Sequence, residues 1–181
     1  MSSHTNSTKN IGKSTYDLVR TKIESRTFSS KSVPTEIKKK ILEAARLTGS
    51  GNNIQHWRFI LIQKKESIKQ LADDSKSGPW VASANFAVIV LTDPQYDFHM
   101  IDAGRAIQSM MLTAWSFGVG SGIYVRLNID SMTKDFAIPS NLNITAVLGF
   151  GYPVKKILGK KDRKPISQIA FQEKYGQKLE L

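Results

Sequence analysis

The chain has 181 residues, of which 40% are hydrophobic, and it contains no cysteine. This length suits one domain with a sizeable core. The absence of cysteine excludes disulfides, thiolate nucleophiles and sulfur-ligated metals. The longest uninterrupted apolar stretch, residues 86–91, is far shorter than the roughly 20 residues that span a bilayer, and the N-terminal residues form no hydrophobic signal region. We therefore expect a soluble, cytoplasmic protein that does not bind membranes.

The formal net charge of +11 is concentrated at the two ends of the chain. Residues 1–65 carry +9, residues 66–150 carry −3 and residues 151–181 carry +5. Basic ends can bind nucleic acid through its phosphate backbone. No zinc-finger spacing or RNA-binding motif accompanies them, however, and the Lys38–Lys40 run fits the solvated side of an amphipathic helix. We favour the alternative, a small anionic ligand bound by basic residues from both ends.

The first half of the chain alternates helical and extended patterns. Residues 1–13 are rich in Ser, Thr and Asn, which predicts a disordered tail. A helix is expected over residues 14–25. A second helix is expected over 34–47, because a proline suits its first turn and apolar residues follow at helical spacing. The short apolar run 59–62 predicts a buried strand, and a short helix should follow it over 66–74.

The second half predicts three more strands around one long helix. The apolar run 86–92 should form a strand, and residues 102–117 are apolar on nearly every side of a helix. Such a helix belongs at the centre of a domain or a dimer. Residues 118–124 and 144–150 should form the remaining strands, and the last thirty residues are polar enough to need a partner surface. We find no repeat, so residues 14–181 are expected to form a single domain.

The usual catalytic motifs are absent from the sequence. The histidines His4, His56 and His99 are scattered without metal-binding spacing, so no metal site is predicted. No Gly-x-Ser-x-Gly motif marks a hydrolase, and no Gly-x-Gly-x-x-Gly follows a strand as in dinucleotide-binding folds. If the protein is an enzyme, an organic cofactor must supply its reactivity.

One segment looks suited to hold such a cofactor. Residues 49–57 read Gly-Ser-Gly-Asn-Asn-Ile-Gln-His-Trp, which places small and turn-forming residues before polar side chains and an apolar strand. Free backbone N–H groups and short side chains in this position can meet a flat polar ligand. The alternative is an ordinary helix C-cap and turn, for which Gly49 or Gly51 alone would suffice.

The order and spacing of several motifs resemble the nitroreductase family of flavin enzymes from about residue 16 to residue 176. The motifs are Arg26, Phe28, Val33 and Pro34 before the helix segment Ile41–Ala45; Ser50, Asn53, Gln55 and Trp57; the helix end Gly118–Ser121; the strand end Leu148–Pro153; and the basic stretch Lys161–Pro165. None of these pieces is decisive alone.

The resemblance implies an α+β fold in which helices flank a mostly antiparallel central sheet. It also implies an intertwined homodimer, with the C-terminal segment embracing the partner subunit and FMN bound at the interface. The implied activity is ping-pong reduction of nitroaromatics, quinones or related acceptors, with NADH or NADPH passing hydride to flavin N5. Flavin-fragmenting and dehalogenating members of the same family remain alternatives, and so does a basic nucleic-acid-binding protein.

The same resemblance implies which residues bind FMN, and no side chain needs to act as a committed acid or base. Lys22 and Arg26 occupy the first basic motif, where Glu24 replaces the family's usual hydroxyl residue. The loop residues that match are Ser50, Gly51 and Asn53; the backbone of Gly122, Ile123 and Tyr124 should approach the flavin ring; and Lys161 and Arg163 should bind the phosphate. Tyr124, Phe136 and Trp80 are candidates to line the substrate pocket, although aromatic residues more often form core.

Overall fold

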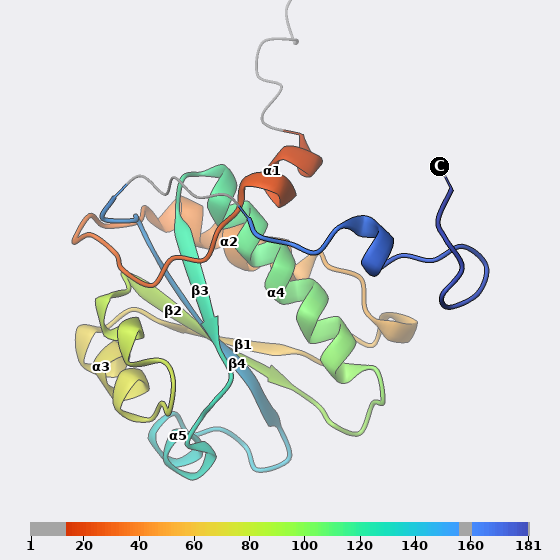
Figure 1. The fold of residues 1–181 in the computed structure, drawn as a ribbon. Helices are drawn as coiled ribbons and strands as arrows, with labels where there is room; N and C mark the ends of the chain where they lie inside the picture. The colour runs from red at the N-terminus through yellow and green to blue at the C-terminus, as the bar shows by residue number, and fades with distance from the viewer. Residues whose placement is uncertain (1–13, 156–160, 181) are drawn as a thin grey trace, which may run out of the picture.

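The structure is a computed structural model that describes residues 14–155 and 161–180. Its centre is one antiparallel sheet with the strand order β1-β2-β4-β3 (Figure 1). The strands are β1 (Arg58–Ile62), β2 (Phe86–Thr92), β3 (Gly120–Tyr124) and β4 (Asn143–Gly151). All four predicted strands are therefore confirmed, and so is the α+β class with its antiparallel sheet.

Helices cover both faces of this sheet. Helices α2 and α4 pack on one face, and α3 and α5 pack on the other (Figure 1). The bounds are α1 (Thr15–Thr21), α2 (Thr35–Arg46), α3 (Lys65–Asp73), α4 (His99–Ser116) and α5 (Ile129–Asp135), with short 3₁₀ turns η1 (Gly51–Asn53), η2 (Pro79–Ser83) and η3 (Ile166–Gln168).

Strand β2 explains why the core divides into two layers. Every residue of β2 is buried, because both faces of this central strand are covered. Side chains alternate across a strand, so Phe86, Val88 and Val90 pack toward α2 and α4. Their neighbours Ala87, Ile89 and Leu91 pack in the opposite layer. The uninterrupted apolar pattern of this strand is therefore the signature of burial on two sides.

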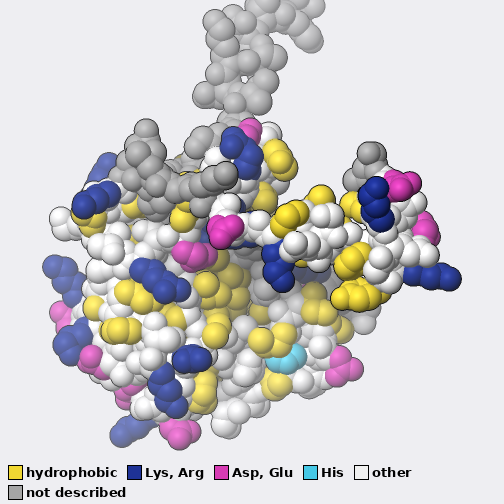
Figure 2. All heavy atoms as spheres, viewed as in Figure 1, with side chains coloured by type: hydrophobic (Ala, Val, Ile, Leu, Met, Phe, Trp, Pro, Cys, Tyr) yellow, Lys and Arg dark blue, Asp and Glu magenta, His cyan; other side chains and the backbone are white. Residues whose placement is uncertain are grey.

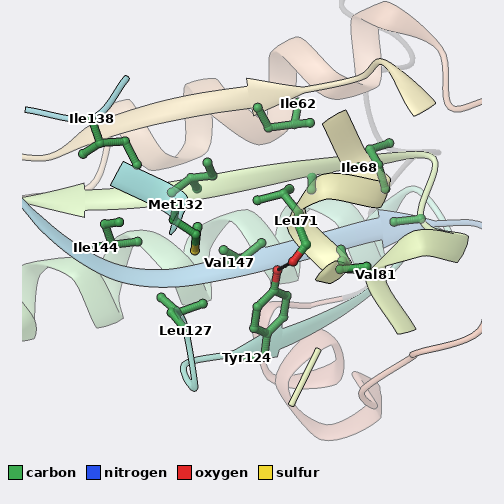
Figure 3. Packing of buried hydrophobic residues seen from close by; sticks show 14 of the residues in the cluster. Ile62, Ile68, Leu71, Val81, Tyr124, Leu127, Met132, Ile138, Ile144 and Val147 are labelled. Carbon is green, nitrogen blue, oxygen red and sulfur yellow. Dashed lines mark hydrogen bonds between the residues drawn. The ribbon is translucent and has the colours of Figure 1, made fainter. Parts of the chain in front are cut away.

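The layer that contains α3 and α5 is closed by aromatic side chains. Tyr124 is 4% exposed, and its hydroxyl donates a 3.1 Å hydrogen bond to the Leu71 carbonyl (Figure 3). The Trp80 ring lies over Gly122 and Gly149, which are paired across β3 and β4; a Cβ on either glycine would approach the ring within 2.7–2.8 Å. The Tyr124 side chain is therefore core rather than pocket lining, whereas Trp80 is only partly buried, and its place in a substrate pocket stays a prediction.

Phe136 belongs to the same layer, where it packs against the buried cluster around Met132. It follows α5, a seven-residue helix that the sequence reading missed. Only Met132 is fully buried within that helix, so its apolar periodicity is too weak to identify it. Phe136 itself is only partly buried, so its place in a substrate pocket stays a prediction.

The first helix ends earlier than the sequence pattern suggests. We expected a helix over residues 14–25, but α1 ends at Thr21. The chain then becomes extended and pairs with the free edge of β3, where Glu24 bridges Ser121 and the Ser25 N–H donates to the Ser121 carbonyl at 2.9 Å. Covering an exposed strand edge satisfies backbone groups that a longer helix would leave unpaired.

Three further expectations concern the N-terminal tail, membrane-spanning helices and metal sites. The tail predicted at residues 1–13 lies outside the described residues. Among residues 14–155 and 161–180, no helix combines the length and apolar character needed to cross a bilayer. The same residues contain no group of three His, Cys, Asp or Glu side chains that could hold a metal ion.

Candidate functional site

The end of α1, the middle of α4 and the start of the C-terminal segment enclose a pocket of about 400 Å³. This pocket, which we name the cationic pocket, is lined by Lys22, Ile23, Glu24, Gln108, Lys161, Asp162 and Arg163. The C-terminal segment reaches it by running across α4 beside α1 (Figure 1), and the Lys161 Nζ donates to the Val19 carbonyl of α1. The fold thus brings together three basic residues predicted from opposite ends of the chain.

The three cations of this pocket act on one another. The Lys22 side chain is 9% exposed, and its Nζ donates to the Glu24 carboxylate. Partial burial lowers the pKa of Lys161, and the positive charges of Arg163 and Lys22 lower it further. Burial and the neighbouring positive charges disfavour the protonated form of Lys161, whereas a bound anion would favour it. The pocket is therefore electrostatically suited to a small anion.

A second pocket of about 420 Å³ lies next to the cationic pocket, and we name it the adjoining pocket. It is lined by Glu24, Ser25, Arg26, Thr27, Pro153, Val154 and Lys155, so Glu24 borders both. The Arg26 guanidinium carbon lies 5.9 Å from the centre of the Trp80 ring, within the range of a cation–π contact. Arg26 is thereby placed beside the three pocket cations, although it does not line their pocket.

The free edge of β3 passes these pockets. Because the Ser121 carbonyl points away from β4 toward Ser25, the backbone groups of Ile123, two residues on, point the same way. Gly122 lies against the layer that contains α3 and α5, where the absence of a Cβ leaves room for the Trp80 ring and the Ser25 carbonyl. Of the predicted stretch Gly122 to Tyr124, the part that can meet a ligand at this edge is therefore the backbone of Ile123.

The loop that contains Ser50, Gly51 and Asn53 is held by a buried carboxylate on α4. Asp102 is 2% exposed; it accepts a 2.9 Å hydrogen bond from the Gly51 N–H, and His56 Nε2 lies 3.3 Å from the same oxygen. Within the loop, the Ser50 hydroxyl accepts the Gln55 N–H at 3.0 Å. The loop is thus tied both to α4 and to itself.

The backbone of this loop is also strained. Asn52, Asn53 and Gln55 have φ values of 49°, 56° and 55°, in the left-handed region that side chains other than glycine disfavour. Gly51 lies so close to Phe98 that an added Cβ would approach its ring within 2.6 Å. Such a conformation persists only where surrounding contacts hold it, and it is common at ligand-binding loops.

The loop and the cationic pocket occupy different parts of α4. The loop binds at Asp102, and the pocket begins at Gln108. Six helical residues correspond to about 9 Å of rise. None of the residues 49–57 lines the cationic pocket of the same chain, as far as the described residues extend. The structure therefore unites Lys22, Lys161 and Arg163, and leaves Ser50, Gly51 and Asn53 apart from them.

The sequence reading missed two residues of this region. Asp102 belongs to a stripe of buried positions at every fourth residue of α4, which continues through Ala106, Met110 and Ala114. An acidic residue in such a stripe signals a buried polar contact, and this pattern could have identified it. Gln108 is exposed on α4 and faces the cationic pocket only because the C-terminal segment crosses there, so no local signal marks it.

Comparison with known proteins identifies the family of this chain. The family model described as "Nitroreductase family" matches residues 20–94 and 78–152. An Archaeoglobus fulgidus protein, provisionally named an NADH dehydrogenase/NAD(P)H nitroreductase, is 30% identical over 145 residues, which cover 75% of this chain and 83% of the relative. The FMN reductase [NAD(P)H] of Bacillus subtilis is 27% identical over 181 residues, covering 86% of this chain and 72% of the relative.

Solved structures share the fold. A provisionally named nitroreductase from Desulfovibrio desulfuricans, solved in complex with FMN, superposes with a TM-score of 0.81 at 23% identity. The match covers 90% of this chain and 98% of that one. Because the family model matches most of this chain, the chain belongs to the nitroreductase family.

Proposed function

We propose that this chain is an FMN-dependent oxidoreductase that uses NADH or NADPH to reduce nitroaromatic, quinone or related acceptors by a ping-pong mechanism. The observation that carries the proposal is the cationic pocket, in which Lys22, Lys161 and Arg163 meet beside the β3 edge of a nitroreductase-family fold. The names of the relatives agree with it, since one is an FMN reductase that uses NAD(P)H and another was solved with FMN.

The residues of the cationic pocket fit the phosphate of FMN. A guanidinium and two ammonium groups can donate charge-assisted hydrogen bonds to a dianion. Such binding would offset the burial and the positive charges of Arg163 and Lys22, which together lower the pKa of Lys161. The pocket volume of about 400 Å³ suits one end of a long ligand, and the adjoining pocket of about 420 Å³ is lined by Arg26. Both ends of a flavin mononucleotide thus have a complementary surface.

The chain's own groups would bind and orient the cofactor rather than take part in its chemistry. Bound FMN would supply the hydride-accepting and hydride-donating centre. Arg26 would place positive charge at the polar edge of the flavin ring, where it stabilises the negative charge that reduction adds. The backbone N–H and carbonyl of Ile123 would hold the ring by its polar edge. No committed acid or base is required among these residues.

We further propose that the protein is a homodimer. Ile101 is 67% exposed on the outer face of α4, and an added Cβ on Gly104 would meet no atom within 4 Å among the described residues. Glycine inside a helix is less stable than alanine by about 1 kcal/mol, so its place on this face supports close approach by a second copy. Ile101→Asp should convert a dimer to monomers in light scattering, and a monomeric wild type would contradict the proposal.

The C-terminal segment is the part that would embrace the partner subunit. It extends away from the body of the molecule and displays hydrophobic side chains (Figure 2), with Ile166, Ile169 and Tyr175 exposed by 64%, 65% and 93%. Exposed apolar groups on an extended arm are typical of a segment that packs against another chain. Removing residues 170–181 should therefore weaken the dimer, whereas a truncated protein that dimerises as tightly as the full chain would contradict this role.

An anaerobic absorbance titration tests the enzymatic proposal. The purified protein is reconstituted with FMN, titrated first with NADH and then, in a separate sample, with NADPH, and finally mixed with a nitroaromatic acceptor. Bleaching of the flavin band and its return with the acceptor are the expected results. Failure to bind FMN would overturn the proposal and direct attention to nucleic acid. If FMN binds but neither nucleotide reduces it, the proposed cofactor site is retained and NADH and NADPH are excluded as electron donors.

A further inference from the structure

Glu24 has a fixed position between the two pockets. Its backbone bridges Ser121 at the edge of β3, so the sheet determines where the side chain begins. The carboxylate then reaches Lys22, whose ammonium group is otherwise 4.0 Å from the Met111 sulfur in a buried setting. Burial of an ammonium group is unfavourable unless an anion accompanies it. Glu24 is therefore the anion that accompanies Lys22 when the pocket holds no ligand.

The other two cations are arranged differently. Among residues 14–155 and 161–180, Lys22–Glu24 is the ion pair inside the cationic pocket, and neither Lys161 nor Arg163 lies within 4.0 Å of a carboxylate. A ligand phosphate would find these two cations available. Lys22, in contrast, would have to share its charge between the phosphate and Glu24, and the two anions would repel each other at short range.

From this arrangement we infer that Glu24 limits the affinity of the cationic pocket for a phosphate dianion and thereby reduces the preference for FMN over unphosphorylated riboflavin. The inference rests on the proposed function for the identity of the flavin. As a consequence, the site binds the phosphate more weakly than three cations would without the Glu24 carboxylate. Bound flavin would then be held to a greater degree by the adjoining pocket, through Arg26.

Equilibrium binding measures this effect without any assay of activity. Dissociation constants for FMN and riboflavin are obtained from flavin fluorescence quenching for the wild type, Glu24→Gln and a control, Glu36→Gln. The control removes the same charge from an exposed position on α2 outside the cationic pocket. We expect Glu24→Gln to tighten FMN binding about tenfold, a change of about 1.4 kcal/mol, and riboflavin binding by less than about twofold. Glu36→Gln should change neither constant by more than about twofold.

Three outcomes would overturn the inference. Weaker FMN binding by Glu24→Gln would mean that Glu24 orients Lys22 for the phosphate instead of competing with it. If FMN and riboflavin binding tightened equally, the effect would not involve the phosphate. If the dissociation constant for FMN were unchanged, Glu24 would have no influence on phosphate binding. If Glu24→Gln fails to fold, Glu24→Asp serves as a second variant. The shorter side chain keeps the negative charge but moves it away from Lys22, so this variant should bind FMN more tightly than the wild type.

Inorganic phosphate separates this inference from the proposed function. If the wild type binds neither flavin, the proposed function fails, but the effect of Glu24 on a dianion can still be measured. Phosphate should then raise the unfolding temperature of Glu24→Gln more than that of the wild type, at equal ionic strength set with chloride. An equal rise in both proteins would overturn the inference independently of FMN.

Discussion

The cationic pocket and the loop of residues 49–57 are prepared for ligands in opposite ways. The loop is held by a buried carboxylate, and its strained backbone is supported by its own hydrogen bonds. The pocket instead gathers three positive charges, of which only Lys22 has a carboxylate partner among the described residues. The loop is therefore pre-organised by hydrogen bonds, whereas the pocket is pre-organised by charge and becomes more stable when an anion binds.

This difference separates what each region contributes to binding. A rigid loop lowers the entropy that must be lost when a ligand is bound, and its effect is insensitive to salt. A set of cations in a partly exposed pocket contributes attraction that salt screens and that depends on protonation. Perturbations that remove the buried hydrogen bonds should therefore affect the loop, and those that change the charge at the pocket should affect the pocket.

The largest effect is expected from Asp102→Ala. The substitution leaves the His56 ring and the Gly51 N–H without the carboxylate that they share inside the protein. Leaving buried hydrogen-bonding groups without a partner typically costs about 1–3 kcal/mol for each group, so we expect a loss of about 3 kcal/mol. Urea unfolding measures the change, with Asp97→Ala as the control because Asp97 is an exposed acid just before α4. A loss below about 1 kcal/mol would show that Asp102 does not hold the loop.

The next largest effect concerns the pocket. Replacing Lys161 and Arg163 together by glutamine removes two of its three cations, and each charge-assisted hydrogen bond contributes about 1.5 kcal/mol. FMN binding should weaken about 100-fold, while riboflavin binding changes little. The control pair, Lys39→Gln with Arg46→Gln, removes one lysine and one arginine from α2. If both double variants weaken FMN binding equally, the effect comes from net charge and not from the pocket.

The fold was largely predictable because its signals are local. The bounds of β2 at residues 86–92 match the prediction, since a strand buried on both faces is continuously apolar. Helix α4 begins at His99, three residues before the predicted start, because Phe98 provides no side-chain cap that would mark the boundary. Helix α1 stops at Thr21 because of pairing with β3, which is a tertiary contact that no local pattern contains.

The site was less predictable from residues alone. Lys22 and Lys161 are separated by about 140 positions, and nothing in their spacing indicates that they meet. Their selection depended on the resemblance to the family, and the structure places both of them in one pocket. Asp102 could have been found as an acid within a buried helical stripe. Gln108 could not, because its place in the site depends on where the C-terminal segment crosses α4.

A smaller effect should come from salt. Raising NaCl from 50 to 500 mM shortens the screening length from about 14 Å to about 4 Å, so FMN binding at the partly exposed pocket should weaken about fivefold. The buried contacts of the loop are shielded from solvent, and the unfolding temperature of the apoprotein should change little. Titrations at the two salt concentrations, with riboflavin as the uncharged comparison, measure the contrast. An equal salt effect on FMN and riboflavin would remove the electrostatic explanation.

The smallest effect should be a dependence of FMN affinity on pH. Burial, Arg163 and Lys22 lower the pKa of Lys161 in the free protein, and a bound phosphate would raise it again. Binding is then accompanied by proton uptake, so affinity is constant well below the lowered pKa and decreases as pH rises through it. We therefore expect FMN affinity to begin its decrease at a lower pH than an ordinary lysine would cause. Lys161→Arg should remove this decrease, because a guanidinium stays protonated at these pH values. If this variant shows the same decrease as the wild type, Lys161 is not the titrating group, and the pocket does not depend on its protonation.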